Sequence, residues 1–196
     1  MKIFFYKLFL LFIILLIGGV FYLSLIGIET SKFNNIITHE IKKKNPLLLV
    51  ELKKIQIKFD IKEFQIYLST YNPLVNYQNI NIPIKEINIY SKILPLIKSK
   101  IEINQVDLLI ENFDINKIQS AASRIKPSNL KTYLLNNLKK GNVTKLFGNI
   151  NFDNSYKITN YKFSGNFEKV NLQISDSHVV EDLKLNFIAD KNLVLL

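Results

Sequence analysis

An uncharged run of twenty-one residues, from Leu8 to Ile28, restricts the possible folds of this chain more than any other feature. About 20 apolar residues in a helix cross the ~30 Å hydrocarbon core of a bilayer. A cleavable secretory signal has a shorter apolar region of about 7–15 residues, followed by a small-residue cleavage site. No such site follows the run here. The sequence therefore predicts an uncleaved transmembrane anchor over residues 8–28, preceded by a short head of residues 1–7.

The charges that flank this run give an equivocal orientation. Lys2 and Lys7 precede it, and Lys32 and a lysine triplet at 42–44 follow it. The positive-inside rule therefore mildly opposes export of the long C-terminal part. A very short basic head, one span and a long polar chain are nevertheless the layout of a signal-anchor. On this ground we expect a single-pass protein with a cytoplasmic N-terminus and residues 29–196 exported.

The composition excludes several classes of function. The chain is basic, with a formal net charge of +10, but Arg124 is its single arginine, and a nucleic-acid reader would be expected to use arginine forks. We therefore expect no nucleic-acid partner, whereas a lysine-rich surface suits anionic lipid headgroups. No cysteine and only two histidines occur, and none of the common catalytic motifs is present. The sequence predicts no catalytic residues, no cofactor and no metal site, and hence no enzyme.

The hydrophobic period changes along the chain. Residues 29–45 have helical spacing and predict an amphipathic juxtamembrane helix that ends before Pro46. From residue 47 the apolar residues alternate with polar ones, which predicts β-strands with one apolar face. A pair of helices interrupts the strands over 115–140, with Asp114 and Ser128 as N-caps and Gly141 just past the second helix. Strands resume at Val143.

Three further patterns refine this prediction. An apolar residue, two polar ones and another apolar residue recur at 52–55, 84–87, 103–106, 158–161, 167–170 and 180–183. Each is either a β-bulge in a curved sheet or a turn between short strands. The dipeptide Phe-Asp occurs at 59–60, 113–114 and 152–153, where a turn or helix cap is favoured over a cation ligand. Residues 192–196 resemble the start of another strand, so we expect the polypeptide to continue.

The order of these elements resembles the N-terminal part of AsmA-like envelope proteins, the AsmA, TamB and YhdP type. The segments that carry the likeness are 52–64, 101–118 and especially 141–187, with the repetitive strand sequences 147–153, 165–172 and 180–187. It is a likeness of pattern with no invariant signature, and no functional residue is carried over. The resemblance implies an inner-membrane anchor leading into a β-groove, similar to the chorein-type, bridge-like lipid-transfer proteins, in the periplasm of a Gram-negative cell.

The expected fold is therefore mostly β with some α. An N-terminal transmembrane helix leads to a curved antiparallel β-groove over 46–196, with the helical pair packed at one end. The expected partners are the inner membrane and the acyl chains of its phospholipids, in transport that maintains the outer membrane. The residues expected to line the groove are Ile55, Ile57, Phe59, Ile66, Leu68, Ile82, Ile84, Ile87, Ile89, Val106, Leu108 and Ile110.

Two alternatives stay open at this point. The same residues would form the core of a closed domain if the helices at 115–140 covered them, because a groove and a core both need one apolar face. The chain would instead be a membrane-anchored β-rich adaptor if it bound other envelope proteins by strand addition. A membrane-tethered enzyme whose active site lies beyond Leu196 is a third hypothesis.

Overall fold

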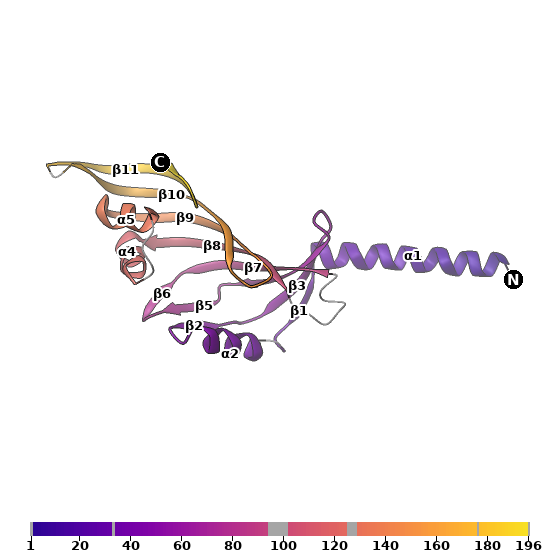
Figure 1. The fold of residues 1–196 in the computed structure, drawn as a ribbon. Coiled ribbons are helices and arrows are strands. Elements are labelled where there is room, and N and C mark those ends of the chain that lie inside the picture. Colours follow the sequence, from indigo (N-terminus) through magenta and orange to yellow (C-terminus); the bar gives the residue numbers. More distant parts are fainter. Residues whose placement is uncertain (1, 33, 94–101, 125–128, 176, 196) are drawn as a thin grey trace.

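The computed structural model describes residues 2–32, 34–93, 102–124, 129–175 and 177–195. It is mostly β, with an N-terminal apolar helix, a large antiparallel sheet and a pair of helices, as the sequence predicts (Figure 1). The helices are α1 (Lys2–Leu25), α2 (Asn34–Lys44), α4 (Ile115–Ser123) and α5 (Asn129–Asn136).

The strands of the described residues form two antiparallel sheets. The large sheet has, in spatial order, β1 (Ile28–Thr30), β3 (Ile55–Asp60), β4 (Gln65–Tyr71), β7 (Ile84–Lys92), β8 (Ile103–Asp114), β9 (Leu138–Phe152), β10 (Ile158–Ser175), β11 (His178–Asp190) and β12 (Val194–Leu195). The small sheet has the order β2 (Leu48–Glu51), β5 (Leu74–Tyr77) and β6 (Ile80–Ile82).

Helix α1 is long and apolar enough to cross a membrane, over Phe4–Leu25. The predicted anchor ran to Ile28, but the helix ends three residues earlier. Gly27 has a φ of +81°, which ends the helix, and Ile28 pairs with Ile57 as the first residue of β1. The juxtamembrane helix predicted over 29–45 is correspondingly shorter, because residues 28–30 form an edge strand and α2 begins at Asn34.

The strands are long and bulged. Register shifts occur at five of the six predicted sites, namely those within 84–87, 103–106, 158–161, 167–170 and 180–183. Positive φ angles of 54° at Lys169 and 55° at Asp182 accompany two of them. The sixth site is different, because Lys53 and Lys54 form the junction between β2 and β3. The bulges keep the apolar residues on one face through strands of up to 18 residues.

The end of the helical pair differs from the prediction. Helix α5 ends at Asn136, and β9 begins at Leu138, so Gly141 lies inside a strand and is no helix C-cap. The reason is tertiary: Leu138 and Val143 pair with Leu172 and Phe167 of β10 and are almost fully buried there, and register shifts between the two pairs let both side chains reach the buried side. Gly141 lies so close to its neighbours that a Cβ there would meet side-chain atoms of Ile115 and Val170 at 2.9 Å.

The three Phe-Asp dipeptides end strands, as expected. One carboxylate oxygen of each aspartate accepts hydrogen bonds from backbone N–H groups just downstream: Asp60 from Lys62 and Glu63, Asp114 from Asn116, and Asp153 from Ser155 and Lys157. The new strand predicted near residue 192 is β12, because Asp190 caps a tight turn and β12 pairs with the end of β11.

Candidate functional site

One face of the large sheet carries apolar residues in register across its strands, and we call it the apolar face. Residues that pair directly across antiparallel strands lie on the same face. Counted from the end nearest α1, these residues form five cross-strand rows. The first row is Phe59, Ile66, Ser91 and Ile103, and the second is Ile28, Ile57, Leu68, Ile89, Val106, Ile150 and Tyr161. The third row is Ile55, Thr70, Ile87, Leu108, Gly148, Phe163, Ala189 and Val194; the fourth is Ile84, Ile110, Leu146, Gly165 and Phe187; the fifth is Phe113, Val143, Phe167 and Leu185.

Eleven of the twelve predicted lining residues lie on this face. The twelfth, Ile82, belongs to β6 of the small sheet, where it packs against the buried cluster described below. The first two rows contain six of the predicted residues: Ile57, Phe59, Ile66, Leu68, Ile89 and Val106. The other five, Ile55, Ile84, Ile87, Leu108 and Ile110, lie further from α1.

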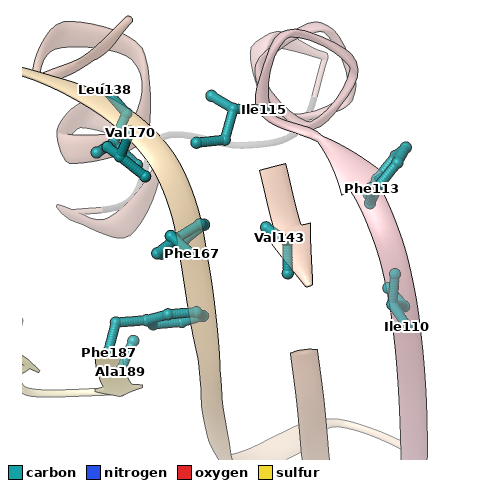
Figure 2. Packing of buried hydrophobic residues seen from close by; sticks show 9 residues of the cluster. All are labelled: Ile110, Phe113, Ile115, Leu138, Val143, Phe167, Val170, Phe187 and Ala189. Atoms are coloured by element: carbon teal, nitrogen blue, oxygen red, sulfur yellow. The ribbon is translucent and has the colours of Figure 1, made fainter. Parts of the chain in front are cut away.

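The far end of the apolar face is covered. Nine buried residues form one cluster there, which draws on β8, β9, β10, β11 and the start of α4: Ile110, Phe113, Ile115, Leu138, Val143, Phe167, Val170, Phe187 and Ala189 (Figure 2). The Phe167 and Phe187 rings stack at a centroid distance of 4.6 Å. Helices α4 and α5 both contact β9. We call the last three rows, together with this cluster, the covered half. Its other apolar residues are mostly partly buried, and six of them pack against the cluster: Ile84, Leu108, Leu146, Phe163, Leu185 and Val194.

The end nearest α1 is different. Every apolar residue of the first two rows on β3, β4, β7, β8, β9 and β10 is partly exposed, from Ile57 on β3 to Tyr161 on β10. Ser91 is the one buried member. We call these two rows the open half. It presents isoleucine, leucine, valine and phenylalanine side chains that are neither sealed in a core nor fully solvated.

The later strands β9 and β10 also contribute to the apolar face, although none of their residues is among the predicted lining residues. Ile150 and Tyr161 extend the second row, and Phe163 extends the third. The Phe163 ring closes over Gly148, where a Cβ would lie 2.7 Å from it. The signal was available, since Val143, Leu146, Gly148 and Ile150 are spaced as an alternating strand with one bulge. The prediction stopped at Ile110 only because the facing of the strands beyond the helical pair was left unassigned.

The opposite face of the open half is polar, and part of it is hydrogen-bonded. The Asp107 carboxylate accepts hydrogen bonds from the Asn149 amide at 2.6 Å and the Gln105 amide at 3.0 Å. The Tyr67 and Tyr90 rings stack beside it at 5.0 Å. Burial, and then the neighbouring Asp107 carboxylate, raise the pKa of the Tyr90 phenol. These contacts link side chains of neighbouring strands across this face of the sheet.

Within the described part of the chain, histidine, aspartate and glutamate side chains do not gather in any group of three or more. The aspartates of the Phe-Asp dipeptides lie on separate turns and bind backbone N–H groups.

Comparisons with known proteins add no assignment. No protein-family model matches the chain, and neither a curated protein nor a solved structure matches it. The likeness to AsmA-like proteins therefore remains a prediction from sequence pattern.

Proposed function

We propose that this chain is a non-enzymatic, membrane-anchored protein that holds phospholipid acyl chains against the open half of its apolar face. In this proposal α1 anchors it in the inner membrane of a Gram-negative envelope and the sheet lies in the periplasm. There it contributes to phospholipid movement toward the outer membrane, as the AsmA-like pattern of its sequence suggests. The apolar face would act as an open groove.

One observation supports this proposal more than any other. An unbroken apolar row crosses six adjacent strands of the open half, from Ile57 to Tyr161, while its residues stay partly exposed. Adjacent strands are about 4.8 Å apart, so the row extends roughly 24 Å. That is long enough to contact most of an extended acyl chain. Each CH₂ group removed from water contributes about 0.8 kcal/mol, so even partial cover of one chain binds it appreciably.

Site-specific photocrosslinking in cells tests the proposal. We expect crosslinkers at Ile66 and Val106, on the apolar face, to capture phospholipid. A crosslinker at Lys162, an exposed residue of the polar face beside Tyr161, is the matched control and should capture none. Gln65 and Asp107 are unsuitable controls, because the first is only 7% exposed and the second accepts two hydrogen bonds. Equal lipid capture on both faces would contradict the proposal.

An edge of the sheet favours a second candidate function, an adaptor that binds a protein strand. Strand β11 pairs with β10 along most of its length, but β12 pairs with it only at Ile188 and Ala189. Among the described residues, the rest of that edge, over 178–187, has no strand beside it. Such an edge accepts another strand through its backbone groups. Crosslinkers at Lys184 that capture a protein, with no lipid at Ile66, would favour the adaptor.

A further inference from the structure

The sheet is joined to α1 without a linker. The backbone N–H groups of Ile26 and Gly27 both donate to the Tyr22 carbonyl, at 2.9 and 3.0 Å, and β1 starts at the next residue. Gly27 packs directly on β3, since a Cβ there would lie 2.7 Å from the Lys58 Cγ and 2.8 Å from the Ile57 carbonyl oxygen. The end of α1 and the end of the sheet are therefore in fixed contact, and the membrane position of one determines that of the other.

The contact extends back along the helix. Val20, Leu23 and Ser24 are less exposed than the rest of α1, and with Gly27 they have the spacing of one helix face. Helix α1 contacts β3 on this side. At 1.5 Å per residue, Val20 lies about 7.5 Å along the helix axis from Leu25, where the apolar window ends. The sheet therefore overlaps the last turns of the membrane-spanning segment rather than starting beyond it.

Strand β3 continues toward the membrane. It is antiparallel to β1, which leads away from α1, so its residues after Ile57 run back past the end of α1, which contacts β3. At about 3.3 Å per residue, Ile61 lies roughly 13 Å beyond Ile57. Figure 1 shows α1 extending away from the end of the sheet at β1 and β3. The β3–β4 turn, residues 61–64, therefore lies at the depth of the last turns of α1.

This turn exposes two large apolar side chains. Ile61 is 46% exposed and Phe64 is 69% exposed. The Asp60 carboxylate holds the turn by accepting hydrogen bonds from the N–H groups of Lys62 and Glu63. Phe64 has a φ of +50°, uncommon for a bulky residue, and its ring meets that of Phe59 edge-on at 5.5 Å. The turn thus presents apolar side chains outward in a fixed conformation, which suits insertion at a membrane surface.

We propose that the β3–β4 turn inserts into the headgroup region of the membrane that α1 crosses, with Ile61 and Phe64 at its acyl boundary. Lys62 and Glu63 then lie among the headgroups. The inference requires α1 to span a membrane but does not depend on lipid transport. If the apolar face does bind lipid, the Phe64–Phe59–Ile66 contacts lead from the bilayer to its first row, and this turn is the entrance.

A second hairpin provides the control. The β10–β11 turn also exposes apolar side chains, with Ile174 at 66% and Val179 at 48%. It lies at the opposite end of the sheet from α1, beyond the helical pair (Figure 1). The two turns therefore match in exposed apolar residues and differ in their distance from α1.

The chain contains no tryptophan, so single-tryptophan variants report depth without background. The full chain would be reconstituted in phosphatidylcholine–phosphatidylglycerol vesicles whose acyl chains carry bromine at a shallow or a deep position. We expect Phe64→Trp to show blue-shifted emission and a large loss of intensity, greater with shallow than with deep bromine. Ile174→Trp should lose none. Leu15→Trp, in the middle of α1, should be quenched most by deep bromine.

Three other outcomes decide against the proposal. Unquenched Phe64→Trp together with quenched Leu15→Trp would place the turn outside the bilayer. Equal quenching of Phe64→Trp and Ile174→Trp would mean that the whole sheet lies on the surface. If Leu15→Trp were unquenched, α1 would not span the bilayer, and the inference would fail. Quenching of Phe64→Trp without lipid capture at Ile66 would keep this inference and reject the proposed function.

Discussion

The two halves of the apolar face are built from the same residue types but are stabilised differently. In the covered half, Leu138, Val143 and Val170 are at most 1% exposed. They belong to the buried cluster on β9 and β10, and the helical pair contacts β9. In the open half, Ile57 and Leu68 stay partly exposed. On the opposite face of the same strands, Asp107 accepts side-chain hydrogen bonds and the Tyr67 and Tyr90 rings stack. Residue type alone therefore does not say which part of an apolar face becomes core.

The largest expected effect is in the covered half. Leu138→Ala should lower the free energy of unfolding by about 2–5 kcal/mol, because Leu138 is fully buried and its loss leaves a cavity. Leu68→Ala in the open half should lower it by only about 1 kcal/mol, since a partly exposed side chain loses less burial. Denaturant unfolding measures both. Equal losses would mean that the open half is packed as tightly as the core.

A charge introduced into the open half is the next test. Ile57→Lys should cost about 1–2 kcal/mol, less than in a sealed core, because the lysine can extend its ammonium group to solvent. It should also abolish lipid capture at Ile66. Lys58→Ile, one residue away on the other face, removes an exposed ammonium group that lies 3.5 Å from the Tyr71 hydroxyl, and should cost well under about 1 kcal/mol. Thermal melts compare the stability of the two variants. Equal losses of stability would contradict the assignment of Ile57 and Lys58 to opposite faces of the sheet.

Hydrogen bonds on the polar face should matter more in the open half. Asp107→Ala removes the acceptor of the Asn149 and Gln105 amides and should cost about 1–1.5 kcal/mol. The matched control is Asn166→Ala, which breaks an exposed amide pair with Asn186 at 2.7 Å behind the covered half. We expect that cost to stay below about 0.5 kcal/mol by denaturant unfolding. If Asn166→Ala lowers the free energy of unfolding as much as Asp107→Ala does, hydrogen bonds on the polar face matter equally in the two halves.

The smallest effect concerns pH. The pKa of Tyr90 is raised in the folded state, so the folded protein retains the phenol proton after the unfolded chain has released it. The stabilisation is fully present below the ordinary tyrosine pKa of about 10 and is lost as the pH rises above it. Tyr90→Phe should therefore lose less stability than the parent as the pH rises. Thermal melts between about pH 9 and 11, on both sides of the ordinary tyrosine pKa, measure this difference. Identical profiles for the variant and the parent would contradict the assignment.

Much of the sheet was predictable from local pattern. Alternation identified the facing of eleven lining residues, because the two-residue period of a strand depends only on the backbone. Paired polar residues identified five bulges for the same reason. The start of β9 was not predictable: Lys139, Lys140 and Gly141 resemble the end of a helix, and only packing of Leu138 against β10 makes them a strand.

The sequence by itself determined that a long apolar helix precedes a β-rich chain with one apolar face, since length and period are local properties. Tertiary structure decided what covers that face. Helices α4 and α5 contact β9 and form a core at one end, while the rows beside α1 remain partly exposed. It also decided that Ile28 is the first residue of the sheet rather than the last of the anchor. These outcomes depend on which distant segments meet, and no local period encodes that.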